Sequence, residues 1–312
     1  MATKTDPDAA KSFLTERYGP GITDLTPLRQ GVWASAYSFE LDGKGLIARF
    51  GTHRDDFEKD RLAARYASRD LPIPRIVEIG EALGGAYAIS ERAPGTHIDG
   101  LDELSMRRVL PSLFAALDAA RRVDLTGSDG FGLWHGTGKA RHRSWPAALL
   151  DVATDGPTRL GPSWRAALAA SPVGTRPFEE AFAALQRLAD RCPEERRLVH
   201  SDLLHFNVLA ANDTVTALLD WGSSIYGDFL FDIAWLTFWS PWYPAWSRID
   251  FAQEALSHYR TIGLTLPFFE ERLRCYELYI GLESQGWYAQ LGDVANLVRT
   301  AKRIRERAGI ID

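Results

Sequence analysis

The sequence has few cysteines and no long apolar runs. The first argues against a protein held together by disulfides, and the second argues against one that spans a membrane. The 312 residues include two cysteines, Cys192 and Cys275. They show no metal-ligand spacing, so we interpret each as a small buried residue of a reducing compartment. The first residues, MATKTDPDAAKSF, lack the apolar core of a signal peptide. No stretch approaches the roughly 18 uninterrupted apolar residues of a membrane span. We therefore expect a cytoplasmic protein that does not associate with a membrane.

An excess of basic charge is also missing. The net charge is −5 at pH 7 and the pI is about 5.9, which argues against a nucleic-acid partner because such partners favour a basic face. The same balance is compatible with a small cationic substrate. With 46% hydrophobic and 25% charged residues, the chain has an ordinary globular composition and a length that suits about two domains. We expect a monomer.

The most informative stretch is residues 198–242. His200, Asp202 and Asn207 have the spacing H-x-D-x-x-x-x-N, and Asp220 follows a short apolar run. The catalytic loops of phosphotransferases share this pattern. Asp202 is the candidate catalytic base, because a carboxylate must accept or orient the proton of the attacking hydroxyl. Asn207, the second predicted catalytic residue, and Asp220 would supply the oxygen ligands that Mg²⁺ on ATP phosphates prefers.

Each of these residues alone has a simpler explanation. An isolated Asp or Asn is usually a turn residue, a helix cap or a solvated group, and Asp220 before Trp221 and Gly222 could simply close a strand. The joint arrangement is more specific. Residues 198–199 and 215–219 are predicted to be short strands that lead into the motif loop and into Asp220. Loops positioned by rigid strands are where catalytic groups usually lie.

Upstream of this motif, the pattern predicts a small lobe of five strands and one helix. The turn at residues 31–35 is expected to aim backbone N–H groups and the Ser35 hydroxyl at phosphates. It is not a G-x-G-x-x-G loop, and an ordinary hairpin is the alternative. Arg49 lies in a strand-like run where protein kinases carry a phosphate-binding Lys paired with a helix acid. The alternative for Arg49 is a solvated side chain.

The predicted helix at residues 56–68 supplies the acid. Asp60 shares a face with small residues spaced three, four and seven positions on, so we expect it to pair with Arg49, with Glu58 as the competitor. The segment 91–95 is predicted to be a linker, where adenine would bond backbone groups near Glu91 and Ala93. This places a nucleotide-binding lobe at residues 1–92 and a mostly helical catalytic and acceptor-binding lobe at residues 93–312.

Several segments resemble the aminoglycoside phosphotransferase family. They are LPIPRIVEIGE at 71–81, SERAPG at 90–95, GFG at 130–132, CPEERRLVHSD at 192–202, NVL at 207–209, LLDW at 218–221, YGD at 226–228, FWSPW at 238–242 and IGLES at 280–284. The resemblance covers nearly the full length. It implies an α+β, bilobal, protein-kinase-like fold, with a small N-terminal lobe of antiparallel sheet plus one helix and a larger, mostly helical C-terminal lobe.

The resemblance also implies a reaction. ATP with Mg²⁺ would be the donor, with GTP as an alternative, and a hydroxyl of an aminoglycoside or aminocyclitol antibiotic, hygromycin B foremost, would be the acceptor. The acids Asp228 and Asp232 would mainly brace the catalytic loop. Two departures from the family are visible: Arg49 replaces the commoner Lys, and His205 and Phe206 stand beside the acceptor site in place of smaller, more polar residues.

The acceptor site should contain acids and aromatics, because a polyamine sugar offers ammonium groups and apolar ring faces. The residues assigned to it are Asp202, Asp228, Trp239, Trp242, Glu283 and Tyr288. The alternative for the aromatics is an ordinary core, and for Glu283 an exposed acid on a helix.

Two other functions remain open at this point. One is a kinase of the same fold that acts on a metabolite such as choline, homoserine or a thiosugar. The other is a nucleotide-binding regulator without catalysis. The intact set Asp202, Asn207 and Asp220 argues against the regulator, because it has no need of all three.

Overall fold

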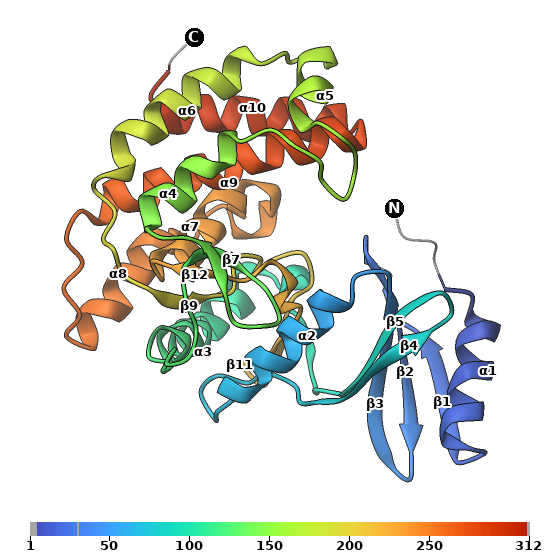
Figure 1. Cartoon of the computed structure of the whole chain (residues 1–312). Coiled ribbons are helices and arrows are strands. Elements are labelled where there is room, and N and C mark those ends of the chain that lie inside the picture. The colour runs from blue at the N-terminus through green and yellow to red at the C-terminus, as the bar shows by residue number, and fades with distance from the viewer. Residues whose placement is uncertain (1–4, 30, 311–312) are drawn as a thin grey trace.

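The computed structural model describes residues 5–29 and 31–310, which form a small N-terminal lobe and a larger C-terminal lobe (Figure 1). The small lobe is built on a five-stranded antiparallel sheet, and helices make up most of the large lobe. The predicted α+β architecture with two unequal lobes is confirmed, although two helices rather than one accompany the sheet. The domain boundary between residues 92 and 93 stays a prediction. The outermost residues of the two predicted domains, 1–4 and 311–312, lie outside the described part.

The strands form three sheets, ordered β1-β2-β3-β5-β4, β11-β10-β6 and β8-β7-β12-β9. In chain order they are β1 (Ile22–Pro27), β2 (Ala34–Leu41), β3 (Lys44–Gly51), β4 (Ile76–Ala82), β5 (Gly85–Glu91), β6 (Thr96–His97), β7 (Phe131–Trp134), β8 (Ala140–His142), β9 (Arg197–Val199), β10 (Val208–Ala211), β11 (Thr214–Leu218) and β12 (Ile225–Gly227).

The α-helices of the described chain are α1 (Pro7–Tyr18), α2 (Arg54–Ala63), α3 (Glu103–Arg121), α4 (Trp145–Leu150), α5 (Trp164–Ala170), α6 (Arg176–Ala189), α7 (Leu230–Trp239), α8 (Phe251–Thr261), α9 (Phe269–Leu291) and α10 (Val294–Ala308). Short 3₁₀ helices are η1 (Ala64–Tyr66), η2 (Ile98–Gly100), η3 (Asp151–Ala153), η4 (Trp221–Ser223), η5 (Ser240–Trp242) and η6 (Pro244–Trp246).

The five-stranded sheet has two different faces. In β3, Leu46, Ala48 and Phe50 are buried on the face that α1 covers. Because successive side chains of a strand point to opposite sides, Arg49 lies on the other face. There the ring of Phe57, from α2, lies 5.2 Å from the guanidinium carbon. The sheet therefore presents a cation to the side on which the large lobe lies (Figure 1).

Helix α2 lies between the sheet and the large lobe (Figure 1). Its first turn carries Asp55 and Asp56. Acids there stabilise a helix because their negative charge interacts favourably with the positive end of the helix dipole. Phe57 packs toward the sheet, whereas Lys59 and Asp60 are buried against backbone groups of η4. One short helix thus contacts both lobes.

Three helices pack closely in the core of the large lobe. Helix α7 is apolar on nearly all sides and almost wholly buried, with Asp232 in its first turn. At Gly281 in α9, a Cβ atom would lie 2.1 Å from Ile304 in α10 and 2.9 Å from Phe238 in α7. The glycine therefore permits an approach that any side chain would prevent.

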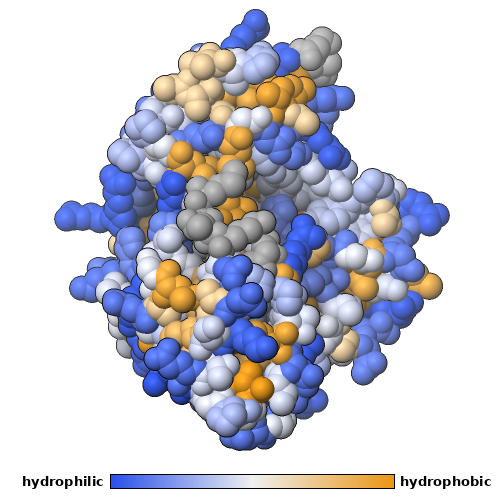
Figure 2. Space-filling model, turned by 90° about the vertical axis from the view of Figure 1, so that its right-hand side faces the viewer, coloured by the Kyte–Doolittle hydropathy of each residue, from blue (hydrophilic) through white to orange (hydrophobic). Residues whose placement is uncertain are grey.

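Hydrophilic residues cover most of the face shown in Figure 2, with hydrophobic residues in small separate groups. Both cysteines, Cys192 and Cys275, are buried and form no disulfide, as predicted. Among the described helices, none is both long and apolar enough to cross a lipid bilayer.

A buried ion pair joins the start of α7 to α9. The two oxygens of Asp228 each accept a hydrogen bond of 2.7 Å from Arg272, and Tyr276 donates a further one. The side chains of Asp228 and Arg272 are 0% and 2% exposed. If one residue of the pair were replaced by an apolar one, the other would remain as a buried charge without a counter-ion.

Replacement of Arg272 tests this pair. We expect Arg272→Met to lower the free energy of unfolding by about 3–5 kcal/mol, because Asp228 loses its counter-ion, and the denaturation midpoint measures it. The double variant Arg272→Met/Asp228→Leu should recover most of the loss. Arg260→Met, at an exposed position on α8, is the matched control. A loss no larger than that of the control would show that the pair does not support the fold.

Candidate active site

The side chain of Asp202 is held on both oxygens. Asn207 donates from Nδ2 to Oδ2 at 3.0 Å and to the backbone carbonyl of Asp202 at 2.8 Å. His205 Nδ1 lies 2.9 Å from the other oxygen, Oδ1. The Asp202 side chain remains 25% exposed. The predicted base is thus fixed in orientation yet reachable by a substrate.

The carboxylate of Asp232, in α7, holds the first half of the catalytic loop. It accepts the backbone N–H groups of His200 at 2.9 Å and Ser201 at 2.8 Å. Ser201 has a left-handed φ of 65°, which a non-glycine residue adopts at a cost. The predicted bracing role of Asp232 agrees with this geometry. Asp228 is different: its buried carboxylate pairs with Arg272, so it contacts neither the loop nor a position that an acceptor could reach.

The carboxylate of Asp99, just before α3, holds the second half of the loop. It accepts the backbone N–H groups of His205 at 2.9 Å and Phe206 at 3.1 Å, and the hydroxyl of Tyr243 at 2.8 Å. His205 and Phe206 have φ of 65° and 74°. Nothing in the sequence indicated Asp99, because it lies 106 residues before His205 and belongs to no motif.

Two contacts connect the catalytic loop to Asp220. The ring Nε2 of His200 lies 2.8 Å from the carbonyl of Leu219, and the N–H of Leu219 donates to the carbonyl of Asn207 at 2.8 Å. Asp220 itself has a left-handed φ of 58°. The positions of Asp202, Asn207 and Asp220 are therefore coupled through the backbone.

The oxygen atoms of Asn207 and Asp220 are ligands of the kind that a hard divalent cation prefers. Because Asn207 donates its Nδ2 to Asp202, its amide oxygen is left for a metal. Asp220 is solvent-exposed, yet the protein around it and the negative charges of Asp60, Asp202 and Asp56 raise its pKa to about 6, against the effect of Arg49. In the described residues no three His, Cys, Asp or Glu side chains gather as a complete metal cage, so phosphate oxygens and water would complete the coordination of Mg²⁺.

Asp60 joins the two lobes at this centre. Its Oδ2 forms an ion pair with Arg49 of the sheet, and its Oδ1 accepts the backbone N–H of Trp221, the residue after Asp220, at 2.7 Å. Burial alone would lower the pKa of Arg49, but the charges of Asp60 and Asp220 raise it. The competitor Glu58 instead pairs with Arg54 and Arg61. The predicted partner of Arg49 is thus the one observed.

A second cation near this centre, Lys59 of α2, was not predicted. Its Nζ donates to the carbonyls of Gly222 at 2.6 Å and Ser224 at 3.2 Å, and lies 4.8 Å from the ring of Trp134. Burial lowers its pKa to about 8, although the nearby Asp56 opposes this. Lys59 therefore fixes the turn that follows Asp220.

The linker after β5 offers a free backbone donor at Ala93. The N–H of Glu91 is donated to the carbonyl of Arg75 at 3.0 Å, and the N–H of Arg92 to Gly45 at 3.1 Å. Ala93 has no backbone hydrogen bond within the described chain. Of the two predicted adenine contacts, Ala93 has the group available, and the amide of Glu91 is already used.

Ser35 does not face the nucleotide side. It lies in β2 and is 3% exposed, and its hydroxyl accepts the N–H of Thr5 at 3.0 Å. Tyr37 and Phe39, two and four positions on, pack against α1, so the alternation of the strand places Ser35 on that same face. The phosphate-binding role predicted for its hydroxyl is therefore not supported by its position. The hairpin pattern did not show which face it would occupy.

The positions of Trp239 and Trp242 also do not fit the predicted stacking of a sugar on their rings. Trp239 is 3% exposed, so its ring faces are not open to a ligand. It packs edge-on to His205 at 5.3 Å. Trp242 donates its indole N–H to Asn296, and the guanidinium of Arg299 lies 4.2 Å from its ring. Trp242 is thus engaged within the large lobe.

The buried indole N–H groups of Trp235 and Trp239 have no hydrogen-bond partner in the described chain. Both rings contact His205, at 6.2 Å and 5.3 Å. An unpaired buried donor is unfavourable, and these two N–H groups could each donate to an acceptor atom of a ligand bound beside the predicted base. The sequence pattern located Trp239 but not the direction of its N–H group, and it did not single out Trp235.

Glu283 and Tyr288, both on α9, lie near enough to the catalytic loop for the charge of Asp202 to influence their pKa values. Glu283 is solvent-exposed, but protein around its carboxyl and the charge of Asp202 raise its pKa to about 7. The ring of Tyr288 packs edge-on to Trp239 at 6.5 Å, and burial raises its pKa to about 12. Both predicted residues are therefore brought toward the base.

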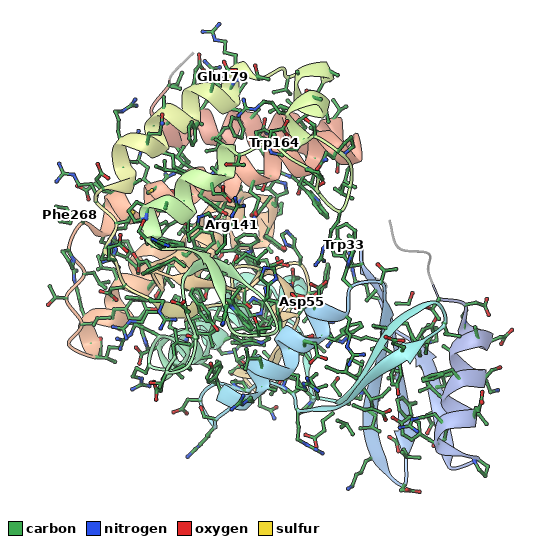
Figure 3. The ribbon with its side chains drawn as sticks, in the orientation of Figure 1. Trp33, Asp55, Arg141, Trp164, Glu179 and Phe268 are labelled. Carbon is green, nitrogen blue, oxygen red and sulfur yellow. The ribbon has the colours of Figure 1, made fainter. Side chains whose placement is uncertain are left out.

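A loop before α5 reaches the small lobe at the same junction. Arg159 makes two hydrogen bonds of 2.7 Å to the carboxylate of Asp56, and its guanidinium lies 5.5 Å from the ring of Trp33. Trp33 is labelled in Figure 3. Trp33, from the turn before β2, also packs edge-on to Trp287 of α9 at 5.6 Å. This contact between lobes was not predicted, because Arg159 lies in a stretch without periodicity.

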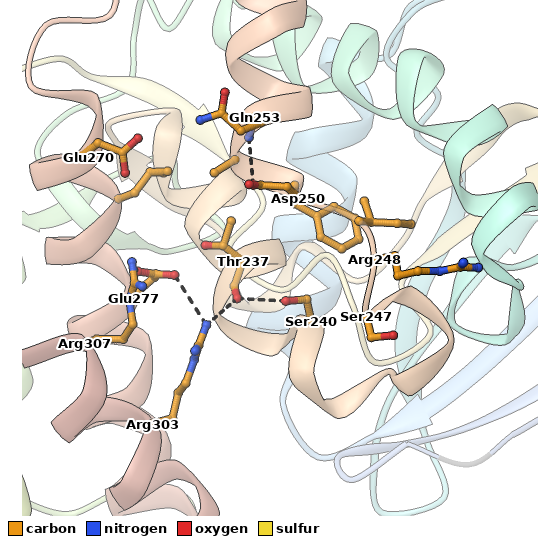
Figure 4. Close-up of a pocket in the computed structure, with 14 residues that line it drawn as sticks. Thr237, Ser240, Ser247, Arg248, Asp250, Gln253, Glu270, Glu277, Arg303 and Arg307 are labelled. Atoms are coloured by element: carbon orange, nitrogen blue, oxygen red, sulfur yellow. Dashed lines mark hydrogen bonds and ion pairs between the residues drawn. The ribbon is translucent and has the colours of Figure 1, made fainter. Parts of the chain in front are cut away.

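A cavity of about 470 Å³ lies elsewhere, among α7, α8, α9 and α10 (Figure 4). Its charged wall includes buried Glu277, which pairs with Arg303 and Arg307. None of the predicted site residues lines it. The cavity is separate from the centre at Asp202.

Known proteins share both sequence and structure with the chain. A family model described as the phosphotransferase enzyme family matches residues 24–265. The Hygromycin-B 4-O-kinase of Escherichia coli is 32% identical over 277 residues, 88% of this chain and 77% of that protein. The chain is also similar to the crystal structure of a thermostable mutant of aminoglycoside phosphotransferase APH(4)-Ia, a ternary complex with AMP-PNP and hygromycin B. The TM-score is 0.84 and the sequence identity 30%, and the match covers 97% of this chain and 98% of that chain. The fold is also that of an aminoglycoside-3'-phosphotransferase of type VIII, with a TM-score of 0.59 and 21% identity over 87% of this chain and 97% of that chain. The expected kinase-like fold is confirmed.

The link through Asp60 yields a testable prediction. Asp60→Ala removes the partners of both Arg49 and the Trp221 N–H, so we expect weaker ADP binding and a stability loss of about 3–5 kcal/mol. Asp60→Asn retains an oxygen for Trp221 and should lose less stability. Calorimetric titration with ADP and thermal denaturation measure both effects. Glu58→Gln is the control; if it weakens ADP binding as much as Asp60→Ala, the link is not specific.

Proposed function

Because the chain belongs to the phosphotransferase enzyme family, we propose that it transfers the γ-phosphoryl group of ATP to a hydroxyl of an aminoglycoside antibiotic, with hygromycin B as the first acceptor. The observation that carries this is the arrangement of Asp202, Asn207 and Asp220 around one loop, in a chain similar to the Escherichia coli hygromycin kinase. The enzyme would act as a cytoplasmic monomer and give resistance to the antibiotic.

The proposed reaction is a direct displacement at phosphorus. The acceptor hydroxyl oxygen attacks the γ-phosphorus while its proton passes to the carboxylate of Asp202. The bond between the γ-phosphorus and the bridging oxygen breaks, and ADP leaves. Since this chemistry depends mainly on position and charge, the two hydrogen bonds that orient Asp202 support the assignment of the base.

Residues of both lobes would hold the donor. Arg49 would bind the α and β phosphates, since an arginine delivers a fixed cation there, and the free amide of Ala93 would bond the purine edge. Asn207 and Asp220 would hold Mg²⁺, which when bound neutralises phosphate charge. The excess of carboxylates around Asp220 favours such a cation. GTP is the alternative donor.

The acceptor would lie between the catalytic loop and α9. Glu283 would bind an ammonium group, and the unpaired indole N–H groups of Trp235 and Trp239 would donate to polar atoms of the sugar. His205 and Phe206 stand beside the acceptor site in place of smaller, more polar residues, and this departure leaves a different acceptor open. A small metabolite such as choline, homoserine or a thiosugar is therefore the second candidate.

An acceptor screen tests the function. We expect ATP consumption, followed by coupled detection of ADP, to increase with hygromycin B and not with the metabolites. Expression should protect a sensitive bacterium from the antibiotic. Asp202→Asn should lower turnover by a factor on the order of 10² or more while ADP binding stays nearly unchanged. Phosphorylation of a metabolite alone would overturn the antibiotic assignment, and wild-type turnover of Asp202→Asn would exclude Asp202 as the base.

The raised pKa of Glu283 predicts a pH dependence of acceptor binding. The ionised carboxylate attracts ammonium groups, and below its pKa of about 7 the neutral form predominates. The KM for hygromycin B should therefore rise as the pH falls from about 8 to about 6, with little change in the KM for ATP. Glu283→Gln should show a high KM across this range. An unchanged pH profile in this variant would show that Glu283 does not bind the acceptor.

A further inference from the structure

The catalytic loop contains two consecutive residues in an unfavourable backbone conformation. His205 and Phe206 have φ of 65° and 74°, and a left-handed conformation is unfavourable for a non-glycine residue. Such strain persists only where surrounding structure enforces it, and it marks functional positions. Here the enforcing group is Asp99, whose two carboxylate oxygens accept both backbone N–H groups.

This conformation places the His205 ring against Asp202. Nδ1 lies 2.9 Å from Oδ1 of Asp202, while Asn207 Nδ2 occupies the other oxygen, Oδ2, at 3.0 Å. With one donor on each oxygen, the carboxylate cannot rotate about its terminal bond without losing both. Each oxygen still has a second lone pair, so orientation is obtained without blocking proton transfer.

The alternative is that His205 is an ordinary solvated side chain, since it is 45% exposed. Two observations argue against it. The ring contacts the edges of Trp235 and Trp239 on α7, so its plane is constrained from a second element. Its Nδ1 also lies within hydrogen-bond distance, 2.9 Å, of Oδ1 of Asp202, so the ring has a polar partner within the protein.

We propose that His205 is a positioning residue that holds the carboxylate of Asp202 in the orientation needed to accept the proton of the acceptor hydroxyl. The inference rests on the proposed function, because it takes Asp202 as the base. The role requires an N–H donor at the place of Nδ1. The amide of an asparagine occupies nearly the same place, and asparagine also tolerates a left-handed backbone.

The test compares His205→Ala with His205→Asn. Turnover is measured with Mg-ATP and hygromycin B, and also as hydrolysis of ATP by water, so that the result does not depend on the acceptor. His205→Ala should lower kcat by about tenfold to a hundredfold in both assays, with the KM for ATP unchanged. His205→Asn should restore most of the activity. An asparagine variant no better than alanine would overturn the proposal.

A double variant separates positioning from an independent role. If His205 acts only through Asp202, His205→Ala should cause no further loss of turnover in an Asp202→Asn background. A further loss of about tenfold would contradict the proposal. Asn212→Ala is the control for backbone strain, because Asn212 also has a positive φ, 49°, in the exposed turn between β10 and β11. It should affect stability and leave turnover unchanged.

The outcomes also distinguish this inference from the proposed function. Wild-type turnover in Asp202→Asn would remove the base assignment, and the positioning role with it. A large loss in Asp202→Asn combined with wild-type turnover in His205→Ala would leave the phosphotransfer mechanism intact and exclude His205 alone.

Discussion

The carboxylate of Asp60 connects the parts of this molecule that must act together. One oxygen pairs with Arg49 in the five-stranded sheet, and the other accepts the N–H of Trp221 beside Asp220, the proposed metal ligand. Because the two oxygens of a carboxylate accept independently, one side chain sets the distance between a cation of the small lobe and Asp220 of the large lobe. Lys59, its neighbour on α2, adds a second link to the same turn. The residues proposed to bind nucleotide, to hold the metal ion and to act in catalysis all meet at this junction.

Sequence patterns predicted the parts of the site that are local. Two short strands and a loop after the first were predicted to position Asp202, Asn207 and Asp220. The structure has both strands, β9 and β11, and adds β10 between them. Asp60 was found because helical periodicity placed an acid on a face of small residues, next to a strand that carries Arg49. In each case the chemistry is decided by residues within about one loop or one helix turn.

The errors and omissions concern direction and distance. Ser35 lies in the predicted segment but on the opposite face of its strand, because a shift of one residue reverses a side chain. Trp239 lies at the predicted helix end, but its ring is buried, packs edge-on to His205 and leaves its N–H group without a partner in the described chain. Asp228 pairs with Arg272 across 44 residues, and Asp99 supports His205 across 106. Periodicity carries no information about such contacts.

The brace from Asp99 binds main-chain N–H groups rather than side chains. The shape of the loop is therefore largely independent of which residues occupy positions 205 and 206, provided that they tolerate a left-handed backbone. Mutations that exchange these two side chains could change what lies beside the base without refolding the loop. Of the two positions, Phe206 has a side chain that the proposed mechanism does not use, so under antibiotic selection a change there would alter the surroundings of the proposed base with little loss of turnover.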